Sequence, residues 1–174
     1  MKTTILALAL AALCAHQALA SLGETEPDLI KRYGAKTGSF ISESGRFSTL
    51  EFEYLDYHVT VTVLDGASAR ETFSRKDKKP LDPVELDTFL AANALGSKWD
   101  KKLDQEDATV WVLESHRAFA GYYKSDKNNL QQNSLTVKTD DMLAFEQALM
   151  RVQQQHQQQA TARPAGTPDK KLQP

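Results

Sequence analysis

The chain of 174 residues has one cysteine, eight scattered glycines and no apolar run of membrane-spanning length. Because Cys14 lies near the amino terminus, the rest of the chain can form no disulfide framework and offers no thiolate chemistry. The glycines form no phosphate-binding loop. The longest apolar stretch, residues 5–13, is shorter than the roughly 20 residues that a membrane helix needs. Thiol catalysis, P-loop nucleotide binding and a helical membrane span are therefore not expected.

The first twenty residues have the pattern of a cleaved export signal. Lys2 provides a positive start, residues 5–13 form a short apolar core, and a small-x-small pattern ends at Ala20. We predict cleavage before Ser21 and a periplasmic or secreted protein. The alternative, a buried amino-terminal helix, is disfavoured because such a helix would not be apolar on every side. Cys14 lacks the preceding small residue of a lipoprotein, so no lipid anchor is expected.

Charge limits the classes of partner. Removal of 20 of the 174 residues leaves 154, and the loss of Lys2 changes the net charge from −2 to −3. Binding to nucleic acid or to an anionic membrane generally needs a basic surface. The basic run at residues 75–79 falls between a predicted strand and a predicted helix, where a solvated loop is the better interpretation. A protein or an envelope component is the expected partner.

Composition divides the chain into a predicted domain at residues 21–152 and a predicted tail at 153–174. The domain has the size of one ordinary globular unit. The tail opens with a run of glutamines and continues with three prolines and few apolar residues. Such a segment cannot offset the entropy of ordering it. We expect the glutamines to extend the preceding helix by a turn or two and the rest to be disordered.

Three amphipathic helices are predicted from their caps and apolar spacing. The first spans Thr25–Gly34 and the second spans Asp82–Gly96. In both, an acidic residue three positions after the first predicts a capping box. The third begins at Thr139 or Asp140 and has apolar residues at spacings of three and four.

Alternation predicts antiparallel strands. Residues 49–54 and 57–63 alternate between apolar and polar side chains, which predicts a hairpin with one buried face. A three-residue turn at 64–66 then keeps the apolar residues of the next strand on the buried face. This register places Phe73 opposite Tyr57.

A second meander follows the second helix. Its predicted strands are residues 109–113, 118–123 and 134–138. The order of helix then meander therefore occurs twice. The sequence predicts an α+β fold, an antiparallel sheet of two meanders with helices packed on one face.

Three segments resemble a group of small, uncharacterised exported bacterial proteins. Residues 22–38 read LGETEPDLIKRYGAKTG, and that group begins with a similar G-E-T-E-x-x-x-x-x-R-Y-G segment. Residues 61–75 and 89–99 are similar to the group's continuation. The resemblance implies no known activity and no known site residues. The order of elements is also similar to the β-lactamase inhibitor protein fold and to small lipoproteins of outer-membrane assembly, which implies a binding module, although the lipid-attachment cysteine is missing.

The predicted register gathers one polar patch on the solvated face of the first meander. It consists of Glu51, Glu53, His58, Thr60 and Arg70. The patch is either a recognition surface for a partner or an ordinary solvated face with cross-strand charge pairs.

Chemical motifs are scarce elsewhere. The histidines have no metal-ligand spacing, and neither a cofactor nor a metal ion is predicted. We therefore expect a non-enzymatic binding or envelope-associated module. The alternative is a hydrolase or other enzyme with a site around Glu51, Glu53 and His58, although an open face suits acid–base catalysis poorly. Trp99, Trp111, Tyr122 and Tyr123 are predicted to be core or half-core aromatics rather than a binding platform.

Overall fold

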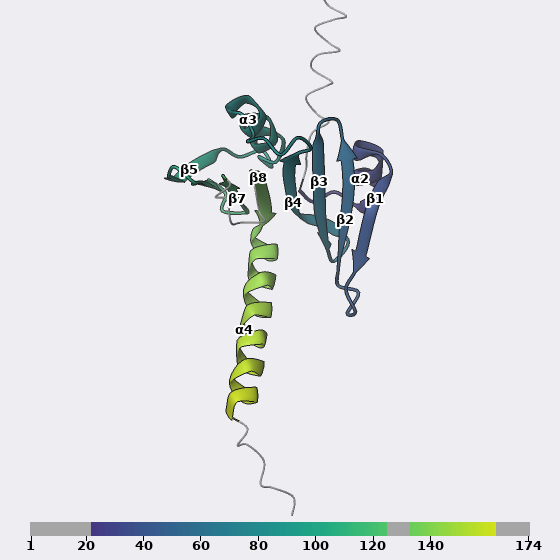
Figure 1. The fold of residues 1–174 in the computed structure, drawn as a ribbon, viewed down its shortest axis with the longest axis vertical. Coiled ribbons are helices and arrows are strands. Elements are labelled where there is room, and N and C mark those ends of the chain that lie inside the picture. The colour runs from purple at the N-terminus through teal and green to yellow at the C-terminus, as the bar shows by residue number, and fades with distance from the viewer. Residues whose placement is uncertain (1–21, 125–132, 163–174) are drawn as a thin grey trace, which may run out of the picture. The chain divides into compact units, whose positions relative to one another are not determined.

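The computed structural model describes residues 22–124 and 133–162 (Figure 1). The chain divides into two compact units, with the boundary between Met142 and Leu143. The predicted export signal, its cleavage site at Ala20 and Ser21, and the tail from residue 163 lie outside the described residues.

The first unit repeats one order of elements, a helix followed by four strands. It first comprises α2 (Glu26–Tyr33), β1 (Lys36–Ile41), β2 (Phe47–Tyr54), β3 (Tyr57–Leu64) and β4 (Ala67–Arg75). It then comprises α3 (Pro83–Ala92), β5 (Trp99–Asp104), β6 (Ala108–Leu113), β7 (Ala118–Tyr123) and β8 (Ser134–Thr139). The predicted α+β class and the two meanders are confirmed. Strands β1 and β5 were not predicted from the alternation of apolar and polar residues.

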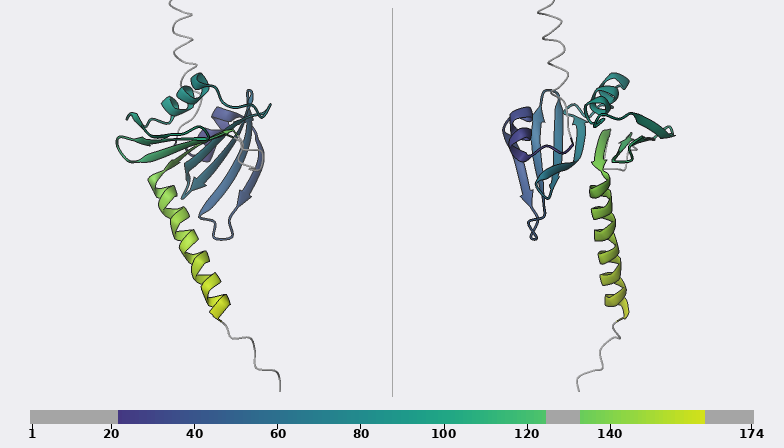
Figure 2. Two further views of the ribbon diagram at one scale, coloured as in Figure 1. Left: turned by 60° about the vertical axis from the view of Figure 1, so that its left-hand side comes forward. Right: turned by 180° about the vertical axis from the view of Figure 1, so that it is seen from behind.

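The eight strands form one antiparallel sheet in the order β1-β2-β3-β4-β8-β7-β6-β5. Each meander runs from an outer edge towards the centre, where the last strands of the two meanders, β4 and β8, pair with each other. Figure 2 shows the two meanders side by side from two further directions. The first strand of each meander, β1 or β5, is therefore an edge of the sheet.

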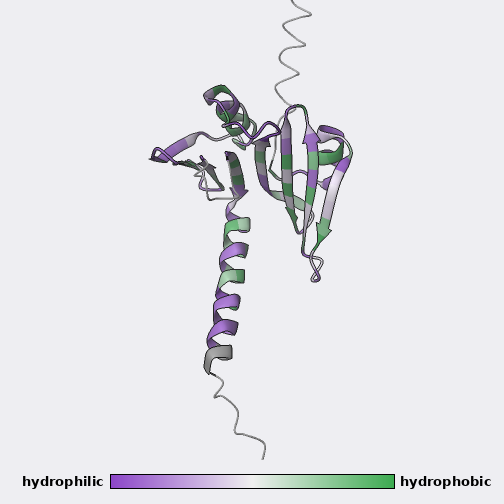
Figure 3. Cartoon of the chain, in the orientation of Figure 1, coloured by the Kyte–Doolittle hydropathy of each residue, from purple (hydrophilic) through white to green (hydrophobic). Residues whose placement is uncertain are grey.

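Helices α2 and α3 pack on the same face of this sheet, which we call the covered face. Tyr33 of α2 lies 5.3 Å from Phe52 of β2, ring centre to ring centre. Phe89 of α3 stacks on Phe73 of β4 at 4.3 Å. In Figure 3, hydrophobic and hydrophilic residues alternate along the central strands, as one buried face requires. The core thus lies between this face and the two helices.

The turn between β3 and β4 differs from the prediction. Leu64 pairs with Ala67, so the turn has two residues rather than three. Asp65 and Gly66 have φ angles of 49° and 92°. Positive φ at both central positions is the geometry of a type I′ turn, whose twist matches that of the flanking strands.

A bulge beyond this turn restores the burial pattern. The register shifts between Thr62 and Val63, and Phe73 then pairs with Val59. The predicted pairing of Phe73 with Tyr57 was therefore wrong, although both residues do lie on the covered face. The extra residue of β4 therefore lies in a bulge within the β3–β4 pair and not in the turn.

The helix caps also differ in part. Thr25 makes no side-chain cap, because its hydroxyl donates instead to Asp28 Oδ2 at 2.6 Å. The box at α3 is confirmed, with Glu85 N donating to Asp82 Oδ1 at 2.8 Å and Asp82 N donating to Glu85 Oε2 at 2.7 Å. Helix α3 ends earlier than predicted, at Ala92.

The third predicted helix is α4 (Asp140–Ala162), which begins directly after β8. It continues through the whole run of glutamines, so the first part of the predicted tail is helical. From Leu143 onwards the helix belongs to the second unit.

Candidate binding face

The sheet face that points away from α2 and α3 carries the predicted polar patch, and we call it the open face. Glu51 pairs with Thr60, and Glu53 pairs with His58, as the hairpin register predicted. Glu51, Glu53 and His58 are exposed, and Thr60 is half-buried. These four residues therefore do lie together on adjacent strands.

Arg70 lies on the same face but one pair further along. It pairs with Thr62, and its Nε and Nη2 atoms donate to Thr62 Oγ1 at 3.2 and 2.9 Å. The neighbour of Thr60 on β4 is Thr72 instead. The bulge beside the turn causes this displacement. Thr72 in turn shares a hydrogen bond of 3.0 Å with Thr136 of β8, so hydroxyl groups continue the patch to the centre of the sheet.

The acidic groups of the patch face water and basic partners. Lys76 Nζ lies 3.0 Å from Glu53 Oε2. This hydrogen bond and the lysine charge lower the pKa of the Glu53 carboxyl. Glu53 is therefore ionised at neutral pH, and it is a poor proton donor for catalysis.

Apolar side chains occupy the open face of the second meander. Phe119 of β7 pairs with Val112 of β6, and both are half-buried. Leu103 of β5 pairs with Val110 and is 39% exposed. Tyr123, at the end of β7, is 46% exposed. The open face is thus polar over β2–β4 and apolar over β5–β7.

The Tyr123 ring lies close to Gly121 on the same face of β7. A Cβ atom at Gly121 would lie 2.9 Å from Cε2 of the Tyr123 ring. The missing side chain therefore leaves room for the ring above the strand. Of the four aromatics predicted to be core or half-core, Trp111 and Tyr122 are buried and Trp99 is half-buried, as expected, whereas Tyr123 is exposed. Tyr123 was therefore missed as a surface residue.

A pocket of about 390 Å³ lies on the covered side, between α3 and β5–β7. Its lining residues are Leu81, Pro83, Leu86, Asp87, Lys101, Asp104, Thr109, Trp111, Tyr122 and Lys124. Asp104 accepts hydrogen bonds from Lys101 at 3.0 Å and Thr109 at 3.2 Å. The lysine bond is the main reason that the pKa of Asp104 lies below its usual value. None of the predicted patch residues lines this pocket.

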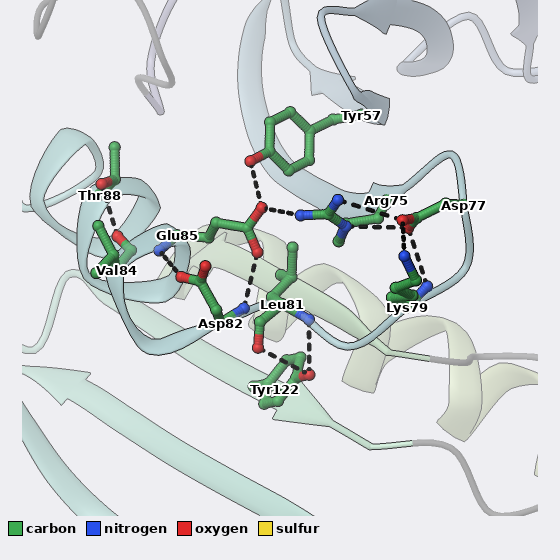
Figure 4. A network of polar contacts seen from close by, with 10 residues as sticks. All are labelled: Tyr57, Arg75, Asp77, Lys79, Leu81, Asp82, Val84, Glu85, Thr88 and Tyr122. Atoms are coloured by element: carbon green, nitrogen blue, oxygen red, sulfur yellow. Dashed lines mark hydrogen bonds and ion pairs between the residues drawn. The ribbon is translucent and has the colours of Figure 1, made fainter.

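A polar network ties the start of α3 to the sheet (Figure 4). Glu85 Oε1 accepts from Tyr57 Oη at 2.6 Å and from Arg75 Nη1 at 2.5 Å. Leu81 N donates to Tyr122 Oη at 3.0 Å. Burial, reinforced by Glu85, raises the pKa of the Tyr57 hydroxyl. The network joins strands of both meanders, which indicates a structural role.

Residues 22–38 also make structural contacts. Arg32 forms an ion pair with Glu24, and Gly23 N donates to Ser68 O at 2.8 Å. Tyr33 Oη lies 3.4 Å from Oε2 of Glu71, the one charged residue among the buried residues that the structure describes. Glu71 was missed, although its spacing of two from Phe73 places it on the covered face.

Comparisons with protein-family models, with curated proteins and with solved structures give no match for this chain. Within residues 22–124 and 133–162, no group of three or more histidine, cysteine or acidic side chains is arranged to hold a metal ion. No helix in those ranges is long and apolar enough to cross a membrane.

Proposed function

We propose that this chain is an exported, non-enzymatic module that binds a protein partner or an envelope component on the open face of its sheet. The observation that carries the proposal is the combination of two surfaces on one continuous face. Charged and hydroxyl groups line β2–β4, where Glu51, Glu53 and His58 are exposed, and half-buried or exposed apolar groups lie on β5–β7. Protein interfaces likewise combine apolar and polar surface.

The size of the face supports a macromolecular partner. Eight strands at a spacing of about 4.8 Å span roughly 34 Å, and a six-residue strand is about 20 Å long. The resulting area of about 700 Å² is close to the roughly 800 Å² that each partner contributes to a standard protein interface. A small ligand would need a concave site instead.

The surroundings of the acidic groups favour binding over hydrolysis. Glu51, Glu53 and His58 are exposed, and they do not line the pocket between α3 and β5–β7. A general acid or base normally has a pKa brought towards neutrality by burial or by neighbouring like charges. The pKa of Glu53 is moved the other way by Lys76.

The test compares four forms of the full chain as baits for proteins of the exported fraction. Tyr123→Lys changes the apolar half of the open face, and Glu53→Lys changes the polar half. Asp87→Lys, at an exposed residue of α3 on the covered side of the sheet, is the matched control. We expect one captured component to lose at least tenfold in affinity, about 1.4 kcal/mol, with both open-face variants and to keep its affinity with the control.

A component that binds all four baits equally, or that is lost only with Asp87→Lys, would contradict the proposal. Export is tested separately, by expressing the full chain and determining the amino terminus of the secreted or periplasmic product. We expect it to begin at Ser21. A product that keeps residues 1–20 would overturn the predicted cleavage.

A further inference from the structure

The two edges of the sheet are protected to different degrees. Strand β5 has four charged residues among its six, Asp100, Lys101, Lys102 and Asp104, and a bulge between Lys101 and Leu103. Charges and bulges are the usual means by which an edge strand avoids pairing with another chain. Strand β1 has one charged residue, Lys36, and its bulge lies at that same end. Residues 38–41 therefore form a regular, uncharged edge.

Within the described residues, the outward hydrogen-bonding groups of the β1 backbone pair with no other strand. Ser42 N donates to Phe47 O at 3.0 Å, which fixes which residues face β2. Because inward and outward groups alternate along an antiparallel strand, Phe40 bonds to β2, whereas Ser39 and Ile41 direct their N–H and C=O groups away from the sheet. Another extended strand could form hydrogen bonds with this row of N–H and C=O groups.

Large apolar side chains flank these groups on both faces. Phe40, on the open face, is 60% exposed, and Ile41, on the covered face, is 69% exposed. The Phe40 ring lies 6.4 Å from that of Phe47. These are the most exposed large apolar side chains near either edge of the described sheet, apart from the turn residue Leu55.

We propose that β1 pairs antiparallel with β1 of a second copy of this chain, about a twofold axis that passes between the two Phe40 residues. In this register Ser39 of each copy lies opposite Ile41 of the other, so their outward groups form the new hydrogen bonds. The two Phe40 residues then form a non-hydrogen-bonded pair, in which facing side chains are closest. Cross-strand aromatic pairs of this kind stabilise a sheet.

Charge complementarity selects a second copy as the occupant. The antiparallel arrangement directs the Lys36 end of each copy's β1 towards the turn that follows β1 in the other copy, and this turn carries the exposed Glu43. Opposite charges therefore meet at both ends of the interface. Lys36 also binds Glu26 at 2.5 Å, but its side chain keeps 33% exposure and can serve both carboxylates.

The symmetry predicts that assembly ends at a dimer. A twofold interface uses both copies of β1 and leaves only the charged β5 strands as edges. The interface does not include the open-face residues on which the proposed function depends, so either proposal can fail without the other.

Sedimentation equilibrium of the full chain tests the dimer. We expect wild type to have twice the mass of one chain, and Phe40→Lys to have the mass of one chain. Leu103→Lys is the matched control, because Leu103 is an exposed apolar residue on the opposite edge strand, and it should leave the dimer intact. A monomeric wild type, a species larger than a dimer, or a dimer that survives Phe40→Lys would overturn the proposal.

A cross-linking experiment tests the register. In a Cys14→Ser background, which has no other cysteine, Phe40→Cys should form an intermolecular disulfide rapidly on mild oxidation. Leu103→Cys should remain a reduced monomer under the same conditions. Equal rates of cross-linking for the two variants would exclude an axis at Phe40.

Discussion

The two halves of the sheet have the same order of elements but different surfaces. In the first half, α2 and β1–β4 carry an open face of charges and hydroxyls and end in an apolar edge. In the second half, which comprises α3 and β5–β8, the open face is apolar over β5–β7 and ends in a charged edge. The comparison teaches that topology sets which positions are exposed, whereas the side chains at those positions set what each half can bind.

The halves are nevertheless joined by one core. Phe89 of α3 packs against Phe73 of β4 and, edge to face at 5.1 Å, against Tyr57 of β3. The helix of the second half therefore covers strands of the first. We expect residues 22–142 to unfold in one cooperative transition.

The largest expected effect contrasts the covered face with the open face. Phe73→Ala removes a fully buried ring and should lower the free energy of unfolding by about 3–5 kcal/mol. Phe119→Ala, on the half-buried open face, should lower it by less than half as much. Urea unfolding followed by circular dichroism measures both. Equal losses would show that the open face is as well covered as the core.

A second prediction concerns the joint between the halves. Glu85→Gln removes the negative charge of the carboxylate that accepts hydrogen bonds from Tyr57 and Arg75. This change should lower the free energy of unfolding by about 1.5–3 kcal/mol. Glu26→Gln weakens only the exposed ion pair with Lys36 and should cost at most about 1 kcal/mol. The same urea assay compares them, and a larger loss for Glu26→Gln would contradict the bridging role of α3.

A third prediction uses pH to probe the core of the first half. Burial, together with the charge of Glu71, raises the pKa of Tyr33 far above the usual value near 10. The fold favours the neutral phenol, so the associated stability is complete below pH 10 and is lost as pH rises above it. Above pH 10 the free energy of unfolding should fall less steeply with pH in Tyr33→Phe than in wild type. The difference in slope should correspond to at most about one proton per molecule. An unchanged slope would mean that Tyr33 ionises without unfolding.

The smallest expected effect compares two glycines of the open face. At Gly121 a Cβ would meet the Tyr123 ring, and at Gly38 it would lie 2.5 Å from Oε2 of Glu51. Both neighbours are ends of flexible side chains that can move aside, so each Gly→Ala variant should change stability by less than about 1 kcal/mol. Near-ultraviolet circular dichroism should change for Gly121→Ala, which displaces a ring, and stay constant for Gly38→Ala. The opposite pattern would contradict the position of Tyr123.

Much of the fold follows from local patterns. The pairing of Glu53 with His58 and the capping box at Asp82 and Glu85 are both found as predicted. Each depends on residues close in sequence, where alternation or cap spacing alone determines the geometry. The polar half of the candidate site could be predicted from the sequence for the same reason.

The apolar half of the candidate site could not be assigned in this way. Tyr122 and Tyr123 are neighbours of the same type, yet one is buried and the other is exposed. Which of them faces the helices depends on the pairing of β7 with β6 and β8. Local sequence carries no such information, because alternation states that two faces exist but not which one will be covered.

The sequence by itself determined the α+β class, the two meanders and the polar patch, because short-range periodicity and capping are properties of a few adjacent residues. Only the tertiary structure decided that β4 and β8 join the meanders, that β1 and β5 are the edges, and that the bulge turns Arg70 towards Thr62. These features arise from contacts between residues far apart in the chain. Burial and backbone hydrogen bonding must be satisfied there for the whole sheet at once, and no single segment specifies how.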